Sequence, residues 1–270
     1  KETQNDTGVQ KPVSLVTDNS SGQLSQARVD VRIDDVPLSM SLTRENGGLV
    51  LRGARPDGVR TELRIGPRPD RFALGYQLRI ENSATAQVKV HATIGLSLKP
   101  THQEKPSFFS PPSDLVNALC AVTDKVKRHV AKDFQEGPIK ETGVRWVGLD
   151  RQYFVVAVVP DAEGSCALSS QDDVLKVDFA YAEKTLEPGK TFNAQWVLYA
   201  GPKRDQELGA ISAHLTDAID YALWKIPLGF MARPMVFLLN AFHRFTHSWG
   251  VAIMLLTLLV KALMFPVTYQ

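Results

Sequence analysis

Apolar and polar residues alternate in several stretches between residues 27 and 98. Because successive side chains of a β-strand point to opposite faces, this alternation predicts antiparallel strands with one buried face. Turn sequences separate the stretches, at Glu45-Asn46-Gly47-Gly48, Pro56-Asp57-Gly58 and Glu81-Asn82-Ser83. The alternating residues are Val29, Val31, Ile33, Leu38, Met40, Leu42, Val59, Thr61, Leu63, Ile65, Phe72, Leu74, Tyr76, Leu78, Ile80, Val88, Val90, Ala92, Ile94, Leu96 and Leu98.

A second block of predicted strands follows a proline-rich loop at residues 106–112. Residues 153–159 form an apolar run of strand length, and residues 175–181 and 192–198 alternate again. The stretch 118–134 also fits a helical stripe, but its surroundings favour strands. We therefore predict that residues 27–203 form a large, mainly antiparallel β-sandwich with few helices.

Residues 1–26 are rich in Ser, Thr, Asn, Gln and Asp. Such a segment buries too little apolar surface to offset the entropy of ordering, so a flexible polar tether is expected. It begins with neither a methionine nor a signal peptide, and we expect the chain to be a fragment of a longer protein.

After Gly201-Pro202 the spacing of the apolar residues changes from that of a strand to that of a helix. Apolar residues recur at steps of three and four and predict an amphipathic helix over residues 204–224 that packs on the sandwich. These residues are Leu208, Ile211, Leu215, Ala218 and Ala222.

Residues 225–248 mix aromatic and basic side chains, too polar to span a membrane and too apolar for water. This mixture predicts a helix in the membrane interface, with Pro227 and Pro234 setting starts or breaks. A buried core helix is the alternative. The predicted interface residues are Trp224, Lys225, Arg233, Phe237, Phe242, Arg244 and Trp249.

Residues 249–270 hold a twenty-residue apolar run, Trp249 to Thr268, with Lys261 as its one charge. Twenty helical residues cross a hydrocarbon core of about 30 Å, so a transmembrane helix is predicted. A cation near the helix centre costs about 2.5–3.5 kcal/mol, and such a residue is by default functional. The alternative is a simple membrane anchor that tolerates one charge.

The composition of the chain argues against nucleic acid as a partner. With 22% charged residues, a net charge of +2 and a mean hydropathy of −0.13, the chain lacks the basic clusters of a nucleic-acid-binding protein. Its two cysteines, Cys120 and Cys166, can form a disulfide if the soluble part faces an oxidising compartment, but two buried free thiols explain the count as well.

Motifs of catalysis are missing from the sequence. We find no phosphate-binding loop, HExxH motif or nucleophile elbow. His243 and His247 have the spacing of a metal site without a third ligand, and His91, His102 and His129 fit scattered surface positions. We expect no enzymatic activity, no metal and no cofactor.

Three segments resemble the bacterial YidC membrane protein insertases in order, spacing and content. They are Trp146 to Phe154 (WVGLDRQYF), Leu198 to Lys203 (LYAGPK), and the run that begins at Trp249-Gly250 and ends at Phe265-Pro266-Val267-Thr268. The resemblance covers residues 27–270 and is most specific from Trp146 onward.

The resemblance implies a periplasmic β-supersandwich domain similar to sugar mutarotases, then an interfacial helix and the first helix of a five-helix membrane core. It places the protein in the inner membrane of Gram-negative bacteria. Its implied role is to insert and help fold inner-membrane proteins, alone or with the Sec translocon. Implied partners are nascent inner-membrane proteins, the lipid bilayer, Sec components and, through regions absent here, the ribosome.

Family members usually carry an arginine where this chain has Lys261, projecting into a hydrophilic groove open to the cytoplasm. The resemblance thus implies that Lys261 is a groove residue that contacts clients. Two alternatives remain open: a periplasmic carbohydrate-binding or interaction domain with a C-terminal anchor, and an anchored ectodomain without insertase activity.

Overall fold

The computed structural model describes residues 25–34, 36–37, 39–45, 48–69, 72–98, 116–123, 125–135, 137–151, 153–171, 174–219 and 229–268. The chain divides into two compact units, residues 1–218 and 219–270, which we treat separately. Most of the predicted tether lies outside the described residues. Its last two residues were placed wrongly, because Ser25 and Gln26 pair with Leu98 and Ser97 in a β-ladder.

The first unit is built mainly from antiparallel strands, which confirms the β part of the predicted fold. Residues 118–134 are strands as favoured, except for a final 3₁₀ turn, η1 (Ala131–Phe134). The strands are β1 (Ser25–Ile33), β2 (Val36–Pro37), β3 (Ser41–Glu45), β4 (Gly48–Ala54), β5 (Val59–Pro67), β6 (Ala73–Asn82), β7 (Val88–Leu98), β8 (Asn117–Val122), β9 (Lys125–His129), β10 (Ile139–Asp150), β11 (Phe154–Pro160), β12 (Gly164–Gln171), β13 (Val174–Ala180), β14 (Lys184–Leu186) and β15 (Thr191–Pro202).

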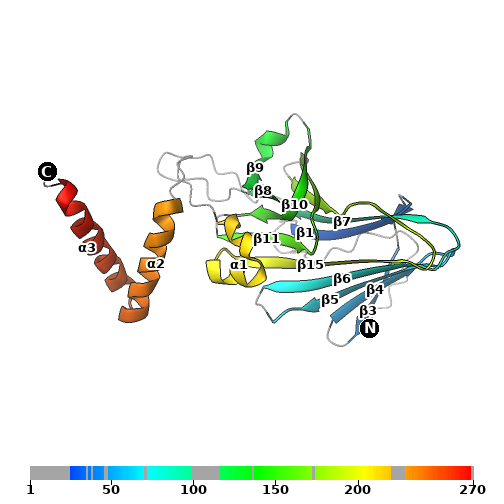
Figure 1. The fold of residues 1–270 in the computed structure, drawn as a ribbon, viewed down its shortest axis with the longest axis horizontal. Helices are drawn as coiled ribbons and strands as arrows, with labels where there is room; N and C mark the ends of the chain where they lie inside the picture. Colours follow the sequence, from blue (N-terminus) through cyan, green and yellow to red (C-terminus); the bar gives the residue numbers. More distant parts are fainter. Residues whose placement is uncertain are drawn as a thin grey trace, which may run out of the picture. The chain divides into compact units, whose positions relative to one another are not determined.

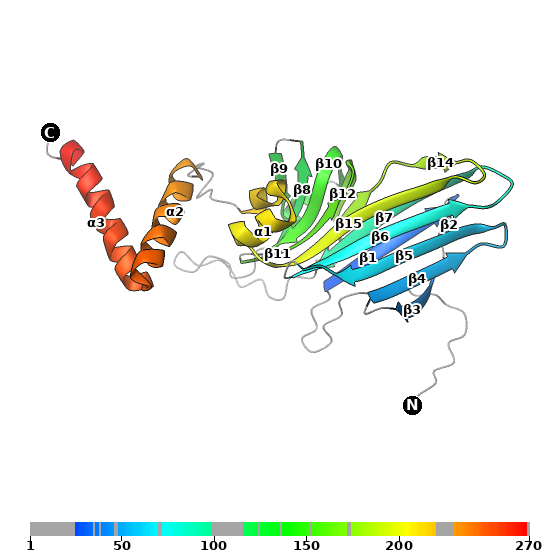
Figure 2. The ribbon, with the colours of Figure 1, turned by 60° about the horizontal axis from the view of Figure 1, so that its bottom comes forward.

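The strands form one hydrogen-bonded path in the order β2-β1-β7-β13-β12-β10-β11-β15-β6-β5-β4-β3. This path folds over so that β1 and β7 lie behind β5, β6 and β15 (Figures 1 and 2). The alternating residues predicted to face inward do so: Leu63, Leu78 and Ala194 stand side by side on β5, β6 and β15 and are buried. They belong to one apolar core that also takes in Ile94, Leu96 and Phe179 from β7 and β13.

Strand β10 joins the parts of this sandwich. It pairs with β12 near its start and with β8 and β11 near its end, and the register shifts around Gly143. Gly143 has φ = 67°, a conformation that glycine adopts without steric cost. Cys120 on β8 and Cys166 on β12, both buried, are joined by a disulfide.

The predicted helix over residues 204–224 is not continuous. Helix α1 (Asp205–Ile211) ends at Ser212, whose backbone is extended, and a 3₁₀ helix, η2 (Ala213–Ala218), follows. The Ser212 hydroxyl accepts a hydrogen bond from the His214 amide at 3.3 Å, which competes with a helical pairing. Leu208, Leu215 and Ala218 are nevertheless fully buried, as the amphipathic pattern predicted.

The second unit contains two helices, α2 (Gly229–Thr246) and α3 (Trp249–Thr268). Helix α2 runs through Pro234, so the expectation that this proline starts or breaks a helix was wrong. A proline removes one backbone hydrogen bond, here close to the start of the helix. Pro227 lies outside the described residues.

Helix α3 has the bounds that the apolar run predicted. Among the described residues, however, no helix meets the length and hydropathy expected of a membrane span. The helix is therefore observed, and its crossing of a membrane stays a prediction.

Candidate functional site

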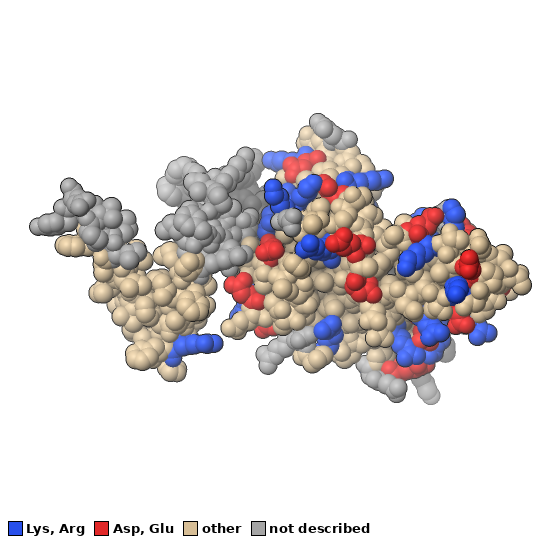
Figure 3. Space-filling view, viewed as in Figure 1, with Lys and Arg blue, Asp and Glu red and all other residues tan. Residues whose placement is uncertain are grey.

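The surface of the α2–α3 pair is apolar to an unusual degree. Most of the atoms that this unit displays in Figure 3 belong to uncharged residues. Large apolar side chains normally lie inside a folded protein, and a contiguous exposed set marks a surface that meets lipid or protein. The exposed ones are Val236, Phe237, Phe245, Trp249, Val251, Ile253, Met254, Leu255, Leu258, Leu259 and Phe265.

Helix α3 meets α2 at the corner that joins them (Figures 1 and 2), and one narrow side of α3 is less exposed than the rest. Ala252 is fully buried, and Leu256 and Val260, four and eight residues further on, are half-buried. Residues four apart share one face of a helix, so these three residues mark one side of α3, which starts from the corner with α2. The remaining circumference has no cover within the described part of the unit.

Lys261 is exposed and belongs to that uncovered side. At about 100° per residue it lies about 140° around the helix from Leu256. Its exposed neighbours at helical spacing are Thr257, Leu258 and Phe265. The structure thus places the one cation of α3 among mainly apolar side chains and turned away from the buried Ala252.

The corner between α2 and α3 holds two of the predicted interface residues. The rings of His243 and Trp249 stack with centroids 3.8 Å apart, and His247 takes φ = 53° to turn the chain. Trp249 remains half exposed, and Arg244 beside the corner is exposed. The corner therefore offers an aromatic ring and a cation together, a pairing suited to the headgroup level of a bilayer.

The other predicted interface residues are scattered. Phe237 is 72% exposed and Phe242 is half-buried. Trp224 and Lys225 lie outside the described residues, as does the side chain of Arg233. None of these positions tests the proposed contact with lipid.

The β domain contains a buried ion pair that our sequence analysis missed. Lys203 Nζ donates to Asp150 Oδ1 at 2.8 Å, and both side chains are largely buried. Burial raises the pKa of the Asp150 carboxyl, and its interactions with Lys203, Arg128 and Asn117 oppose that rise. Both residues stand in the segments that resemble YidC, which could have drawn attention to them. Their pairing across 53 positions, however, leaves no local pattern in the sequence.

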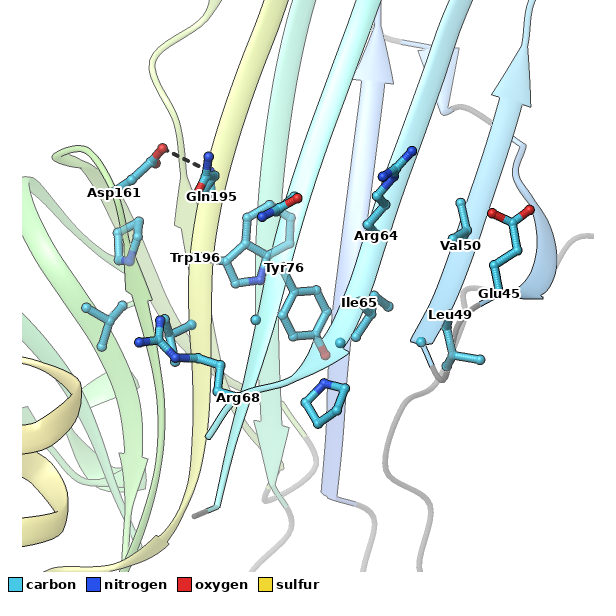
Figure 4. Close-up of a pocket in the computed structure, with 18 residues that line it drawn as sticks. Glu45, Leu49, Val50, Arg64, Ile65, Arg68, Tyr76, Asp161, Gln195 and Trp196 are labelled. Carbon is cyan, nitrogen blue, oxygen red and sulfur yellow. Dashed lines mark hydrogen bonds between the residues drawn. The ribbon is translucent and has the colours of Figure 1, made fainter. Parts of the chain in front are cut away.

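A groove of about 610 Å³ runs across β4, β5, β6 and β15 (Figure 4). Part of its floor is open because Gly66 and Gly75 face each other on β5 and β6 and carry no side chains. Glu45 lies at one end of the groove and Asp161 and Gln195 at the other.

The charged groups of this groove are largely engaged within the fold. Glu45 pairs with Arg52 at 2.6 Å, and Asp161 accepts hydrogen bonds from the Gln195 amide and the Tyr181 hydroxyl at 2.9 and 3.1 Å. Tyr76 lines the groove with a buried hydroxyl that has no hydrogen-bond partner, and burial raises its pKa to about 12. No histidine is found among the described lining residues, and no cluster of three metal-binding side chains occurs within the described ranges.

A family model described as the YidC periplasmic domain matches residues 4–238 of this chain. The chain is 26% identical over 221 residues to the membrane protein insertase YidC of Syntrophobacter fumaroxidans, covering 80% of this chain and 39% of the relative. The YidC of Anaeromyxobacter sp. (strain Fw109-5) is 33% identical over 171 residues, 63% of this chain and 31% of the relative. The chain thus spans less than half the length of these curated relatives.

Two solved structures align with this chain at low sequence identity. A galactose mutarotase-like protein from Lactobacillus casei aligns with a TM-score of 0.46 at 6% identity, covering 62% of this chain and 74% of that one. A galactose mutarotase related enzyme from Lactobacillus acidophilus gives 0.44 at 10%, covering 62% and 71%.

Proposed function

The chain belongs to the YidC family, and from this premise we propose that the complete protein inserts and helps fold inner-membrane proteins. In this proposal residues 25–219 supply the periplasmic domain, α2 lies in the membrane interface and α3 crosses the bilayer. The clients are nascent inner-membrane proteins, and the Sec translocon and the ribosome are expected to take part through surfaces not described here.

The proposed mechanism rests on the position of Lys261. Its side chain is exposed on the side of α3 turned away from the buried Ala252, where further helices of a longer protein could enclose it. A cation held there, with water around it, would replace part of the hydration that a client's polar segment loses on entering the membrane. Acidic groups of the client would be attracted to it while apolar segments pass into lipid.

This mechanism forms and breaks no covalent bond, so we propose that the protein is not an enzyme and uses neither metal nor cofactor. Lysine supplies a compact charge on a flexible stem, without the fork of two parallel donors that arginine presents to a carboxylate. The charge, rather than a fixed bidentate geometry, is then the property that the site requires.

The test uses the full-length protein in proteoliposomes and measures the protease-protected fraction of a newly translated client. We expect Lys261→Ala to lower insertion several-fold and Lys261→Arg to retain it. Thr257→Ala serves as a matched control, because Thr257 is exposed one turn before Lys261 and its hydroxyl only bonds the Ile253 carbonyl at 2.8 Å. Equal insertion by all variants would remove the role assigned to Lys261.

A carbohydrate-binding function has no observation in its favour here. The groove of the β domain is open, but its carboxylates already pair with residues of the fold. We therefore propose that this domain serves as an interaction module of the insertase rather than as a sugar-binding protein.

A further inference from the structure

Four large apolar side chains are exposed at one end of the β domain. The exposed fractions are 51% for Phe72, 38% for Leu74, 67% for Tyr153 and 57% for Phe154. Phe72 and Leu74 stand at the start of β6, and Tyr153 and Phe154 at the start of β11. We call these four residues the aromatic rim.

The strand pairing brings the rim together. Strand β15 lies between β6 and β11, and its last residues are flanked on both sides. On one side the Ala200 amide donates to the Phe72 carbonyl at 2.9 Å; on the other, Phe154 stands opposite Pro202. Phe72 is level with Ala200 and Phe154 with Pro202, two residues further along β15. With strands about 4.8 Å apart and about 3.3 Å per residue, the backbones of Phe72 and Phe154 lie about 12 Å from each other.

The fold holds the rim in place rather than leaving it loose. Phe72 has φ = 64°, which is a rare conformation for a bulky residue and persists only where the surroundings impose it. Gly201 makes room for it, because a Cβ atom at that position would lie 2.8 Å from the Phe72 Cβ and 2.7 Å from the Tyr199 hydroxyl. That hydroxyl donates to the Pro202 carbonyl at 2.8 Å and fixes the end of β15.

The rim occupies the end of the domain from which the chain leaves. Helix α1 begins three residues after Pro202 and lies beside the ends of β11 and β15 in both views (Figures 1 and 2). Helix α1 and η2 are short, so Ala218 lies within about 30 Å of Pro202 along the chain path. The Ala218 carbonyl accepts a hydrogen bond from Arg128 at 2.9 Å and is thereby tied to the β domain.

The connection from Ala218 to the start of α2 at Gly229 holds ten residues, which makes eleven Cα–Cα steps. Fully extended, it reaches at most about 36–40 Å. If α2 and α3 are held by the bilayer, as the proposed function states, the end of the β domain that carries the rim stays within reach of the lipid surface.

The chemistry of the rim suits that surface. Aromatic rings favour the level of the lipid headgroups, and arginine can bind their phosphates. Arg68 and Arg204 are exposed near the rim, and Lys203 pairs with Asp150. Asp205 and Glu207 follow directly in α1, so the local charge is mixed and apolar contact is the main attraction.

We propose that the aromatic rim docks the β domain onto the lipid–water interface of the bilayer that holds α2 and α3. The proposal rests on the proposed function, because a membrane must hold the helices. It adds a second contact with lipid, separate from that of the helices and made by the β domain. The strand pattern alone would suggest that this domain is surrounded by water.

The test places a fluorophore at the rim of the full-length protein in vesicles of phosphatidylcholine and phosphatidylglycerol. Tyr153→Cys is labelled with an environment-sensitive dye, and quenching by lipids with a nitroxide headgroup is measured. The control is Thr85→Cys, exposed in the loop after β6 at the far end of the strand from Phe72. Cys120 and Cys166 are bonded to each other and take no label.

We expect several-fold stronger quenching at position 153 than at position 85. Adding Phe72→Ser and Phe154→Ser to the labelled protein should reduce the quenching at position 153 toward that at position 85. Both are exposed positions, and circular dichroism and thermal unfolding check that the fold is kept.

Flotation of the vesicles separates the two proposals. Protein that floats with the vesicles but shows equal quenching at positions 153 and 85 overturns docking by the rim and leaves the membrane helices in place. Protein that does not float overturns both, because the rim has then no bilayer to meet.

Discussion

At the scale of single residues, the Asp150–Lys203 pair shows how strongly a buried charge depends on its partner. Burial raises the pKa of Asp150 above its usual value of 3.8, so between that value and the raised pKa the folded protein keeps a proton that the unfolded chain has released. The contribution of this group to stability therefore falls as the pH rises through that window. The bond from Lys203 limits the rise.

We predict that Lys203→Met lowers the free energy of unfolding by about 3–5 kcal/mol at neutral pH, because it leaves a buried carboxylate without its cation. The pKa of Asp150 rises further in the variant. The loss of unfolding free energy caused by Lys203→Met therefore becomes smaller as the pH is lowered. Urea unfolding over a pH series measures both effects.

The matched control is Lys125→Met, at an exposed position of β9, for which a change below about 0.5 kcal/mol is expected. The double variant Asp150→Leu, Lys203→Met should recover most of the loss, since neither member of the pair is then left as a buried charge without its partner. If Lys203→Met were as stable as the control at neutral pH, the pair would have no structural importance.

Sequence reasoning found some of these residues and missed others for a physical reason. Leu63, Leu78 and Trp196 follow a period of two, which a strand with one buried face imposes locally. Lys261 stood out because a charge in an apolar run is costly. Asp150 and Lys203, by contrast, meet only through strand pairing, and the exposure of Phe154 depends on where β11 begins.

At the scale of elements, the strands were predicted well from local periodicity, whereas the segment that follows them was not. The predicted sandwich boundary at residue 203 lies one residue beyond the end of β15, because alternation continues until the strand stops. The predicted helix over residues 204–224 is divided at Ser212, where the serine hydroxyl accepts a hydrogen bond from the backbone amide of His214. Amphipathic spacing identified the buried residues but carried no information about that local competition.

The disulfide between β8 and β12 is expected to contribute strongly to the sandwich. It closes a loop of 46 residues, for which the chain-entropy model gives about 4 kcal/mol. We predict that Cys120→Ala, Cys166→Ala lowers the free energy of unfolding by about 2–4 kcal/mol without changing the secondary structure.

Denaturant unfolding of the oxidised protein, the reduced protein and the double variant measures this effect. The reduced protein and the variant should agree, since both cysteines occupy buried sites that small apolar side chains can fill. A variant as stable as the oxidised protein would show that the bond contributes nothing.

At the scale of the whole molecule, the division into two compact units predicts that the β domain folds without the helices. A protein ending at Ile219 should unfold at the same temperature, within about 2 °C, as the β domain of the full chain. Thermal unfolding followed at a β-sheet wavelength tests this. The reason is that its core is closed by its own strands and by Leu208, Leu215 and Ala218 of α1 and η2.

A shorter protein ending at Lys203 provides the contrast. It lacks α1 and η2, so the ring of Trp146, whose Nε1 donates to the His214 carbonyl at 3.1 Å, loses that partner. We expect a clearly lower unfolding temperature. Identical melting of the two truncated proteins would mean that α1 and η2 are not part of the β domain.

The Cys120–Cys166 bond also imposes an order of events in the cell. Cytoplasmic thiols are kept reduced, so a domain that works in the periplasm can acquire this bond only after export. The two cysteines come together only when β10 has paired with both β8 and β12. Oxidation is therefore a late step that reports successful folding, and a cell lacking periplasmic oxidants should accumulate a β domain that is assembled yet easily unfolded.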